Sequence, residues 1–405
     1  MSPRNPVITT APLGVPGFRA AGVRCGIKKR GSDLALIAAD QLATAAGLFT
    51  RSTVVGAPVE VSRERVRAGR VRGVVVNSGC SNVAMGARGR RDAVAMADAA
   101  ARAIGARGAE MLVASTGVIG QPLPIAKIRR GIADAAKALA PDGLGRAARA
   151  IMTTDTVPKH ASTVVWIDGC AVTIAGIAKG VGMIEPNMAT MLAFLLTDAA
   201  ATPAFLRAAL REAADRSFNR LTVDGEGSTS DTSLLLASGC AANAQLRSAR
   251  SPAARRFIDA LTGVATSLAR QLARDGEGAT KLVVVTVTGA RTDGDAERAA
   301  RRIANSMLVK TALFGGDANW GRILQTIGAG RIALRLARTS VRLGGVEVFR
   351  RGASAGPAAR GRARRALAGA ELRIEVDLGL GRGAAQIFTC DLTYDYVKIN
   401  AEYST

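Results

Sequence analysis

The sequence has 405 residues, of which 48% are hydrophobic and 21% charged, the composition of a soluble globular protein of about two or three domains. The net charge is +23, but the arginines are spread over Ala-rich stretches and aromatic residues make up only 3%, so we expect no nucleic-acid partner. The N-terminus lacks the apolar stretch of a secretory signal and no apolar run approaches the roughly 20 residues of a membrane span, so we expect a cytoplasmic protein with no membrane partner.

Cysteine usage agrees with a reducing compartment. The five cysteines are scattered along the chain and never occur in C-x-x-C spacing. This pattern favours free thiols over a disulfide or zinc framework, and no other metal-ligand cluster stands out, so we predict no metal site.

In the first two thirds of the chain, valine-rich runs predict buried strands and Ala-rich segments predict helices. In chain order, the strands are expected at 73–76, 111–114, 162–167 and 281–288, and the helices at 91–104, 203–216 and 251–274. The last helix has the clearest pattern, because Ser251 is a good N-cap, Pro252 suits the first turn, and apolar residues recur at steps of three and four.

The pattern of polar and apolar residues changes after about residue 289. A polar helix is expected over 293–305, and alternating apolar residues predict strands over 332–336 and 372–378. We therefore predict a mixed α/β protein with a main domain over 1–289 and a smaller C-terminal α/β domain over 290–405.

Catalysis by a histidine pair is disfavoured, because the only histidine, His160, lies in a predicted loop and is interpreted as a surface residue. Instead, motifs of small hydroxyl residues and glycine lie at the ends of strands. They are VNSGCSN (76–82), ASTGVIG (114–120), MTTDTVPK (152–159) and TVDGEGSTSDT (222–232). A hydroxyl nucleophile without histidine needs another base, and its own α-amine, with a pKa of about 7.7–8.0, is well suited. An internal threonine gains such an amine only when the preceding peptide bond is cleaved.

The segment KGVGMIEPNMATMLAFLLTDA (179–199) resembles the self-cleavage segment of the ornithine acetyltransferase family. The resemblance continues through GFRAAGVRCGIKK (17–29), STGVIG (115–120), DGEGATK (275–281), LVKTALFGGDANWGRI (308–323) and YVKINAEYST (396–405). It thus spans the chain in order. It implies a layered α-β-β-α core of the self-processing N-terminal-nucleophile kind, with the smaller C-terminal domain beside it.

The resemblance also implies residue roles. The chain should cut itself between Ala189 and Thr190, giving an α chain (1–189) and a β chain (190–405). Thr190 should then act as the nucleophile and carry the acetyl group as an ester. Thr116 and Gly117 should form the oxyanion hole.

The implied reaction moves an acetyl group from N2-acetylornithine to glutamate in arginine biosynthesis, without a cofactor. Whether acetyl-CoA is a further substrate is left open. Two α and two β chains are expected to assemble, and the tail 396–405 is expected to return to the active site. Lys179 and Glu277 suit the charged groups of the substrate, in an order that the sequence leaves open. The implied substrate-binding residues are Thr154, Lys179, Thr190, Glu277, Asn400 and Thr405.

Two alternatives remain at this point. The chain could be an N-terminal-nucleophile amidase or aminopeptidase, in which water accepts the acyl group, or Thr190 could simply cap the apolar segment that follows it. The sequence also departs from the family pattern at Cys80, Val83, Met85 and Glu185. None of these is an implied site residue, so transfer is expected to survive.

Overall fold

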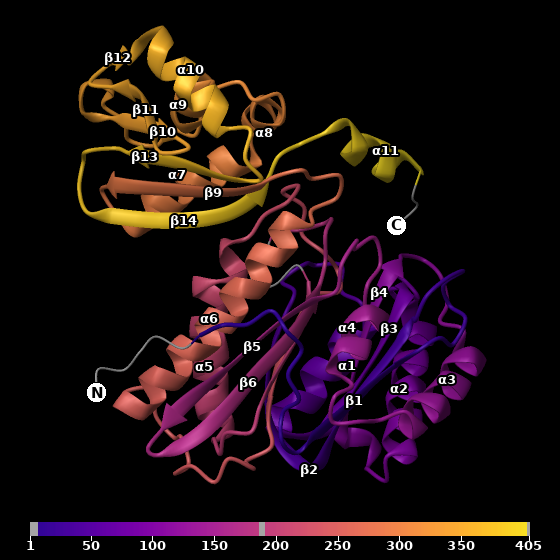
Figure 1. Ribbon diagram of the computed structural model, residues 1–405. Helices are drawn as coiled ribbons and strands as arrows, with labels where there is room; N and C mark the ends of the chain where they lie inside the picture. Colours follow the sequence, from indigo (N-terminus) through magenta and orange to yellow (C-terminus); the bar gives the residue numbers. More distant parts are fainter. Residues whose placement is uncertain (1–6, 186–190, 403–405) are drawn as a thin grey trace.

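The computed structural model describes residues 7–185 and 191–402 (Figure 1). These residues form one sheet of eight strands and one of six, both flanked by helices. The predicted mixed α/β class is therefore confirmed. None of the helices in the described ranges is long and apolar enough to cross a membrane.

The larger sheet has the strand order β4-β3-β2-β8-β7-β6-β5, and β1 pairs with β2. Its longest strand, β2, has 16 residues: residues 34–38 and 43–44 pair with β3, and residues 44–49 pair with β8. The eight strands are β1 (Phe18–Val23), β2 (Leu34–Phe49), β3 (Arg70–Cys80), β4 (Met111–Val118), β5 (Lys159–Ile167), β6 (Cys170–Lys179), β7 (Leu192–Thr197) and β8 (Thr232–Ala237).

This sheet is folded over, so that its two halves face each other across a shared core. Val74 and Val76 of β3 belong to the same buried cluster as Ile177 of β6 and Phe194 of β7. Side chains alternate along a strand, so the intervening residues point to the outer faces. Ile174 of β6, for example, packs in the separate cluster that contains the neighbouring helices.

Helices cover both outer faces. On one side lie α1 (Ala57–Arg65), α2 (Gly86–Ala103) and α3 (Ile125–Lys137), and on the other α5 (Pro203–Arg216) and α6 (Pro252–Arg274). A short helix, α4 (Leu144–Ala150), contributes to the shared core. Figure 1 shows the resulting order of layers, from α5 and α6 through the two half-sheets to α2 and α3. The predicted α-β-β-α layering is confirmed.

The smaller sheet has the order β12-β11-β10-β13-β9-β14 and its own buried core. Its strands are β9 (Leu282–Ala290), β10 (Ser340–Leu343), β11 (Val346–Arg350), β12 (Ala353–Ser354), β13 (Glu371–Asp377) and β14 (Gly383–Cys390). The accompanying helices are α7 (Asp293–Asn305), α8 (Met307–Phe314), α9 (Trp320–Ala329), α10 (Gly356–Ala366) and α11 (Tyr394–Glu402). Because β9 pairs with β13 and β14, we propose that this C-terminal unit begins before Leu282, earlier than the expected boundary at 289–290.

Most predicted elements are present. The helices at 203–216 and 293–305 have the expected bounds, and the hydroxyl of Ser251 caps α6 by accepting a hydrogen bond from the Ala254 N–H. The strand predicted over 332–336 is wrong. That stretch is irregular and runs into a short 3-10 helix (Leu336–Arg338), and pairing with β13 begins only at Ser340.

Candidate active site

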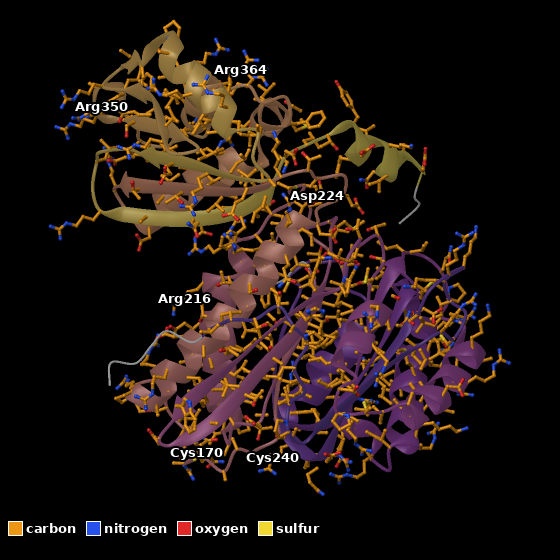
Figure 2. All side chains as sticks on the ribbon, in the orientation of Figure 1. Cys170, Arg216, Asp224, Cys240, Arg350 and Arg364 are labelled. Carbon is orange, nitrogen blue, oxygen red and sulfur yellow. The ribbon has the colours of Figure 1, made fainter. Side chains whose placement is uncertain are left out.

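A pocket of about 240 Å³ lies where the eight-stranded sheet, the turn after α6 and α11 meet. Its walls come from the ends of β4 and β6, the loop before β5, the loop 222–231 before β8, the turn after α6, and α11. Figure 2 labels Asp224, a wall residue, at the level between the two sheets. The labelled Cys170 and Cys240 lie at the opposite end of the larger unit.

The pocket gathers many of the residues that the sequence predicted for the site. Met191, which directly follows Thr190, also lines it. Ala189, Thr190 and Thr405 lie outside the described residues. The predicted residues in the wall are Thr116, Gly117, Thr154, Lys179, Glu277 and Asn400.

Parallel pairing of β3 with β4 places Thr116 and Gly117 at the pocket, with Gly117 opposite Gly79. Gly117 has φ +125°, and an added Cβ would lie 2.4 Å from the carbonyl carbon of Gly79. Both the left-handed backbone and this close approach require glycine. Cys80, where the sequence departs from the family pattern, also lies close to Gly117: its backbone nitrogen would be 2.6 Å from a Cβ added to Gly117.

Lys179 at the end of β6 is buried and points its ammonium at two hydroxyls. Its Nζ donates to Thr116 Oγ1 at 3.1 Å and to Thr153 Oγ1 at 2.8 Å. Burial lowers the pKa of Lys179, while the nearby Asp155 carboxylate opposes this shift. Because Thr116 Oγ1 accepts from an ammonium, the hydroxyl hydrogen of Thr116 remains free to donate into the pocket.

Glu277 forms the opposite wall. Its Oε1 accepts a hydrogen bond from the Thr154 hydroxyl at 2.7 Å, and its Oε2 accepts one from the Asn400 amide at 2.9 Å. A Cβ on Gly182 would lie 2.5 Å from Glu277 Oε2, so glycine makes room for this carboxylate. The carboxylate is thus held by Thr154 and by Asn400, and α11 contributes Tyr396 and Asn400 to the pocket lining.

Beneath the pocket lies a buried charge network that the sequence analysis missed. Lys159 Nζ donates to Asp155 Oδ1 at 2.7 Å and to Asp275 Oδ2 at 2.5 Å, and the Lys159 side chain is fully buried. Asp155 also accepts hydrogen bonds from the N–H groups of Thr153 and Gly180. Burial alone would raise the pKa of Asp155, but the ammonium groups of Lys179 and Lys159 outweigh it and lower the pKa. The network fixes the backbone next to Thr154, Lys179 and Glu277.

The chain is anchored on both sides of the predicted cleavage segment. Before it, Asp224 accepts hydrogen bonds from Met183 N–H at 2.7 Å and Ile184 N–H at 2.8 Å. Glu185, one of the departures, binds Arg301 at 2.8 Å and the Asn305 amide at 3.0 Å, both on α7.

After the segment, the carbonyl of Met191 accepts a hydrogen bond from Thr232 N–H at 2.9 Å, and β7 begins at Leu192. The apolar run after Thr190 is thus a strand, which leaves no helix for Thr190 to cap.

His160 lies outside this pocket. It belongs to β5 and is half-buried, where a surface loop position was expected, and its Nδ1 contacts the Thr10 carbonyl oxygen. His160 is not among the residues that line the pocket.

Comparison with known proteins shows a full-length match. The ArgJ family profile covers residues 19–405. The arginine biosynthesis bifunctional protein ArgJ of Geobacter sulfurreducens is 49% identical over 97% of this chain and its entire own length. The protein of the same name from Symbiobacterium thermophilum is 49% identical over 98% of both chains. The crystal structure of the ArgJ protein from Bacillus halodurans is 41% identical, with a TM-score of 0.50, and covers 52% of this chain and 98% of the crystallised chain.

Proposed function

This chain belongs to the ArgJ family, and from that premise we propose that it transfers the acetyl group of N2-acetylornithine to glutamate through an acetyl ester of Thr190. It is an acyltransferase of arginine biosynthesis. The observation that carries the proposal is the convergence of Thr116, Gly117, Lys179 and Glu277 on one pocket whose wall includes the residue after Thr190. No histidine or metal ligand is needed for this chemistry, because the nucleophile brings its own amine.

The position of Thr116 and Gly117 at the end of β4, in the pocket wall, supports the proposed oxyanion hole. During attack on the acetyl carbonyl, negative charge develops on the carbonyl oxygen, and the Thr116 hydroxyl and the Gly117 N–H are the proposed donors to it. The ammonium of Lys179 polarises the Thr116 hydroxyl, because it donates to Thr116 Oγ1. One such donor contributes roughly 10²–10³-fold in rate.

Charge complementarity supports the substrate class. Acetylornithine and glutamate each carry a carboxylate and an ammonium group. Lys179 donates to two hydroxyls among the described residues, so one of its three N–H groups is left for a substrate carboxylate. The Glu277 carboxylate, held by Thr154 and Asn400, has further lone pairs for a substrate ammonium.

We further propose that the chain matures by cleavage between Ala189 and Thr190. The described residues on either side of the proposed cut are held in place, Glu185 by Arg301 and Met191 by Thr232. The Bacillus halodurans comparison also supports it, because nearly all of that crystallised chain corresponds to about half of this one. We also propose a cytoplasmic assembly of two α and two β chains.

The test combines N-terminal sequencing with activity assays. The wild-type protein should yield a second chain that begins Thr-Met-Leu-Ala-Phe, whereas Thr190→Ala should stay uncut and inactive. An intact, active wild-type chain or an active Thr190→Ala variant would refute the mechanism. Acetate release from acetylornithine without glutamate would instead identify an amidase.

The relatives are described as bifunctional, which supports acetyl-CoA as a second acetyl donor to Thr190. Ornithine release and CoA release, each measured with glutamate in one preparation, distinguish a bifunctional enzyme from one restricted to acetylornithine.

A further inference from the structure

Five cations lie together beside the pocket, and the transfer from acetylornithine uses none of them. Four belong to the loop 24–31, which joins β1 to β2, and the fifth lies in the first turn of α3. Three of them donate a side-chain hydrogen bond, in each case to a backbone carbonyl, and none forms an ion pair with a carboxylate among the described residues. We call these five residues the basic rim: Arg24, Lys28, Lys29, Arg30 and Lys127.

The loop that carries the basic rim is fixed by a buried carboxylate. Asp33 is fully buried, and its two oxygens accept hydrogen bonds from the N–H groups of residues 25–28, at distances between 2.6 and 3.0 Å. The charge of Asp33 is thus used by the loop backbone. The side chains of Arg24, Lys29, Arg30 and Lys127 are exposed. Exposed cations on a loop that is already ordered can bind an anion without first paying the entropy of ordering that loop.

The loop contacts the walls of the pocket through Lys28. Its Nζ donates to the Met152 carbonyl at 2.9 Å, and the next residue, Thr153, lines the pocket. A Cβ added to Gly79 would lie 2.9 Å from Lys28 Cγ, and Gly79 pairs with Gly117 across β3 and β4. The Lys28 side chain therefore lies across the strand ends that carry the proposed oxyanion hole.

Helix α3 connects the basic rim to the pocket from a second direction. The chain that leaves β4 passes Ile119, which lines the pocket, and then enters α3. There Lys127 Nζ donates to the Gly26 carbonyl at 2.9 Å. A Cβ added to Gly131 would lie 2.3 Å from Cys25 Cβ, so α3 packs closely against the loop. The basic rim therefore borders the pocket on the side of β3 and β4.

The pocket itself is too small and too acidic to hold a phosphate-bearing ligand entirely. Its described lining contains one ammonium, that of Lys179, and the carboxyl groups of Asp224, Glu226, Asp231 and Glu277. Like charges repel, so carboxylates disfavour a phosphate in their midst. The volume of about 240 Å³ lies below the roughly 300–1,000 Å³ of sites for drug-sized ligands. A phosphorylated donor with its reacting end in the pocket must therefore place its phosphates outside, where the basic rim supplies cations.

We propose that the basic rim binds the phosphates of acetyl-CoA while the thioester enters the pocket. This inference rests on the proposed function, in which acetyl-CoA is a second acetyl donor. In that step the Thr190 oxygen bonds to the acetyl carbon, the C–S bond breaks, and the hydroxyl proton leaves on the thiol of CoA. The arm between thioester and phosphates is about as long as four extended residues, roughly 14 Å, so the phosphates lie well outside the pocket. Acetylornithine and glutamate carry no phosphate and do not need the rim.

The double variant Lys29→Gln/Arg30→Gln tests the rim, because it removes two exposed charges and keeps long polar side chains. Its KM for acetyl-CoA should rise about tenfold, since charge-assisted contacts to phosphate are lost. S-acetylpantetheine has the same thioester and arm but no phosphate, so its KM should stay at the wild-type value. The control Arg364→Gln/Arg365→Gln removes the same charge from exposed positions on α10, in the C-terminal unit where Figure 2 labels Arg364, and should change neither KM.

The assay follows release of ornithine, CoA or pantetheine with glutamate as acceptor. A wild-type protein without transfer from acetylornithine would refute the proposed function itself, and this inference with it. Transfer from acetylornithine but none from acetyl-CoA would overturn this inference alone. So would an unchanged KM for acetyl-CoA in the rim variant, or an equal rise for S-acetylpantetheine or in the α10 control. A rise confined to acetyl-CoA and to the rim variant supports the inference, as does a wild-type KM for acetyl-CoA that added salt raises more than that for S-acetylpantetheine.

Discussion

Replacing Lys159 by Met should destabilise the larger unit, because it removes the cation between two buried carboxylates. The Asp155 and Asp275 side chains are 0% and 7% exposed, and both bind Lys159 Nζ. Removing one partner of a buried pair costs about 3–5 kcal/mol. Asp155 keeps the N–H groups of Thr153 and Gly180, and Asp275 keeps that of Thr156, so we expect the lower end, about 3 kcal/mol. At about 2 °C per kcal/mol, thermal unfolding should begin about 6 °C lower.

The matched control is Arg19→Met. Arg19 pairs with Asp40 at 2.8 Å, but both side chains are nearly half exposed, so the loss should stay below about 1 kcal/mol. Differential scanning calorimetry measures the unfolding temperature of both variants and of the double variant Lys159→Met/Asp155→Asn. The comparison separates the cost of an unpaired buried charge from the cost of altered packing. The double variant carries one buried carboxylate fewer and should recover part of the loss. Equal, small shifts for Lys159→Met and Arg19→Met would refute the reasoning.

Three further predictions concern the site. Thr116→Ala and Gly117→Ala should each lower kcat by about 10²-fold. Gly120→Ala, where φ is also positive but the space is open, should leave kcat largely unchanged; equal kinetics for all three variants would remove the oxyanion hole. Arg301→Gln should slow self-cleavage about fivefold, equivalent to about 1 kcal/mol, because Glu185 loses its ion pair. Time courses of cleavage, followed on gels, compare Arg301→Gln with Arg298→Gln. The control variant removes an exposed ion pair with Asp295 on the same helix. Because the pKa of Asp155 is lowered in the folded state, its stabilisation is present above about pH 3.9 and is lost as the pH falls through the lower folded value. In Lys159→Met the acid-unfolding midpoint should therefore move to higher pH, and an unmoved midpoint would contradict the coupling.

Local patterns predicted the helices well, because caps and apolar spacing act within one element. Strands were harder. The alternation at 332–336 is that of a strand, yet no strand among the described residues pairs with it, and Leu336 is half exposed. Conversely, the long Ala-rich β2 carries weak β-propensity and was not predicted. It is a strand because β1, β3 and β8 pair with it.

The same distinction applies to the candidate site: local motifs predicted some of its residues, whereas others come together only in the fold. Family resemblance assigns residues by position, and the four residues it predicted at Thr116, Gly117, Lys179 and Glu277 line one pocket. The resemblance does not show which buried charges support them. Lys159 and Asp275 are 116 residues apart in the chain and meet only in the fold. The basic rim is likewise a property of the fold, because Lys127 and Gly26 are 101 residues apart in the chain.

The sheet topology explains how the α and β chains would stay together after the proposed cut between Ala189 and Thr190. The cut would precede β7, which hydrogen-bonds to β6 of the α chain on one side and to β8 on the other. The β8 strand in turn pairs with β2, so two strands of the β chain lie between strands of the α chain. The shared core likewise contains Ile177 from before the cut and Phe194 from after it. Separating the chains would break two full ladders and expose this core, which far outweighs the loss of one peptide bond. The proposed cleavage would therefore leave two chains that are joined through the interior of the larger sheet.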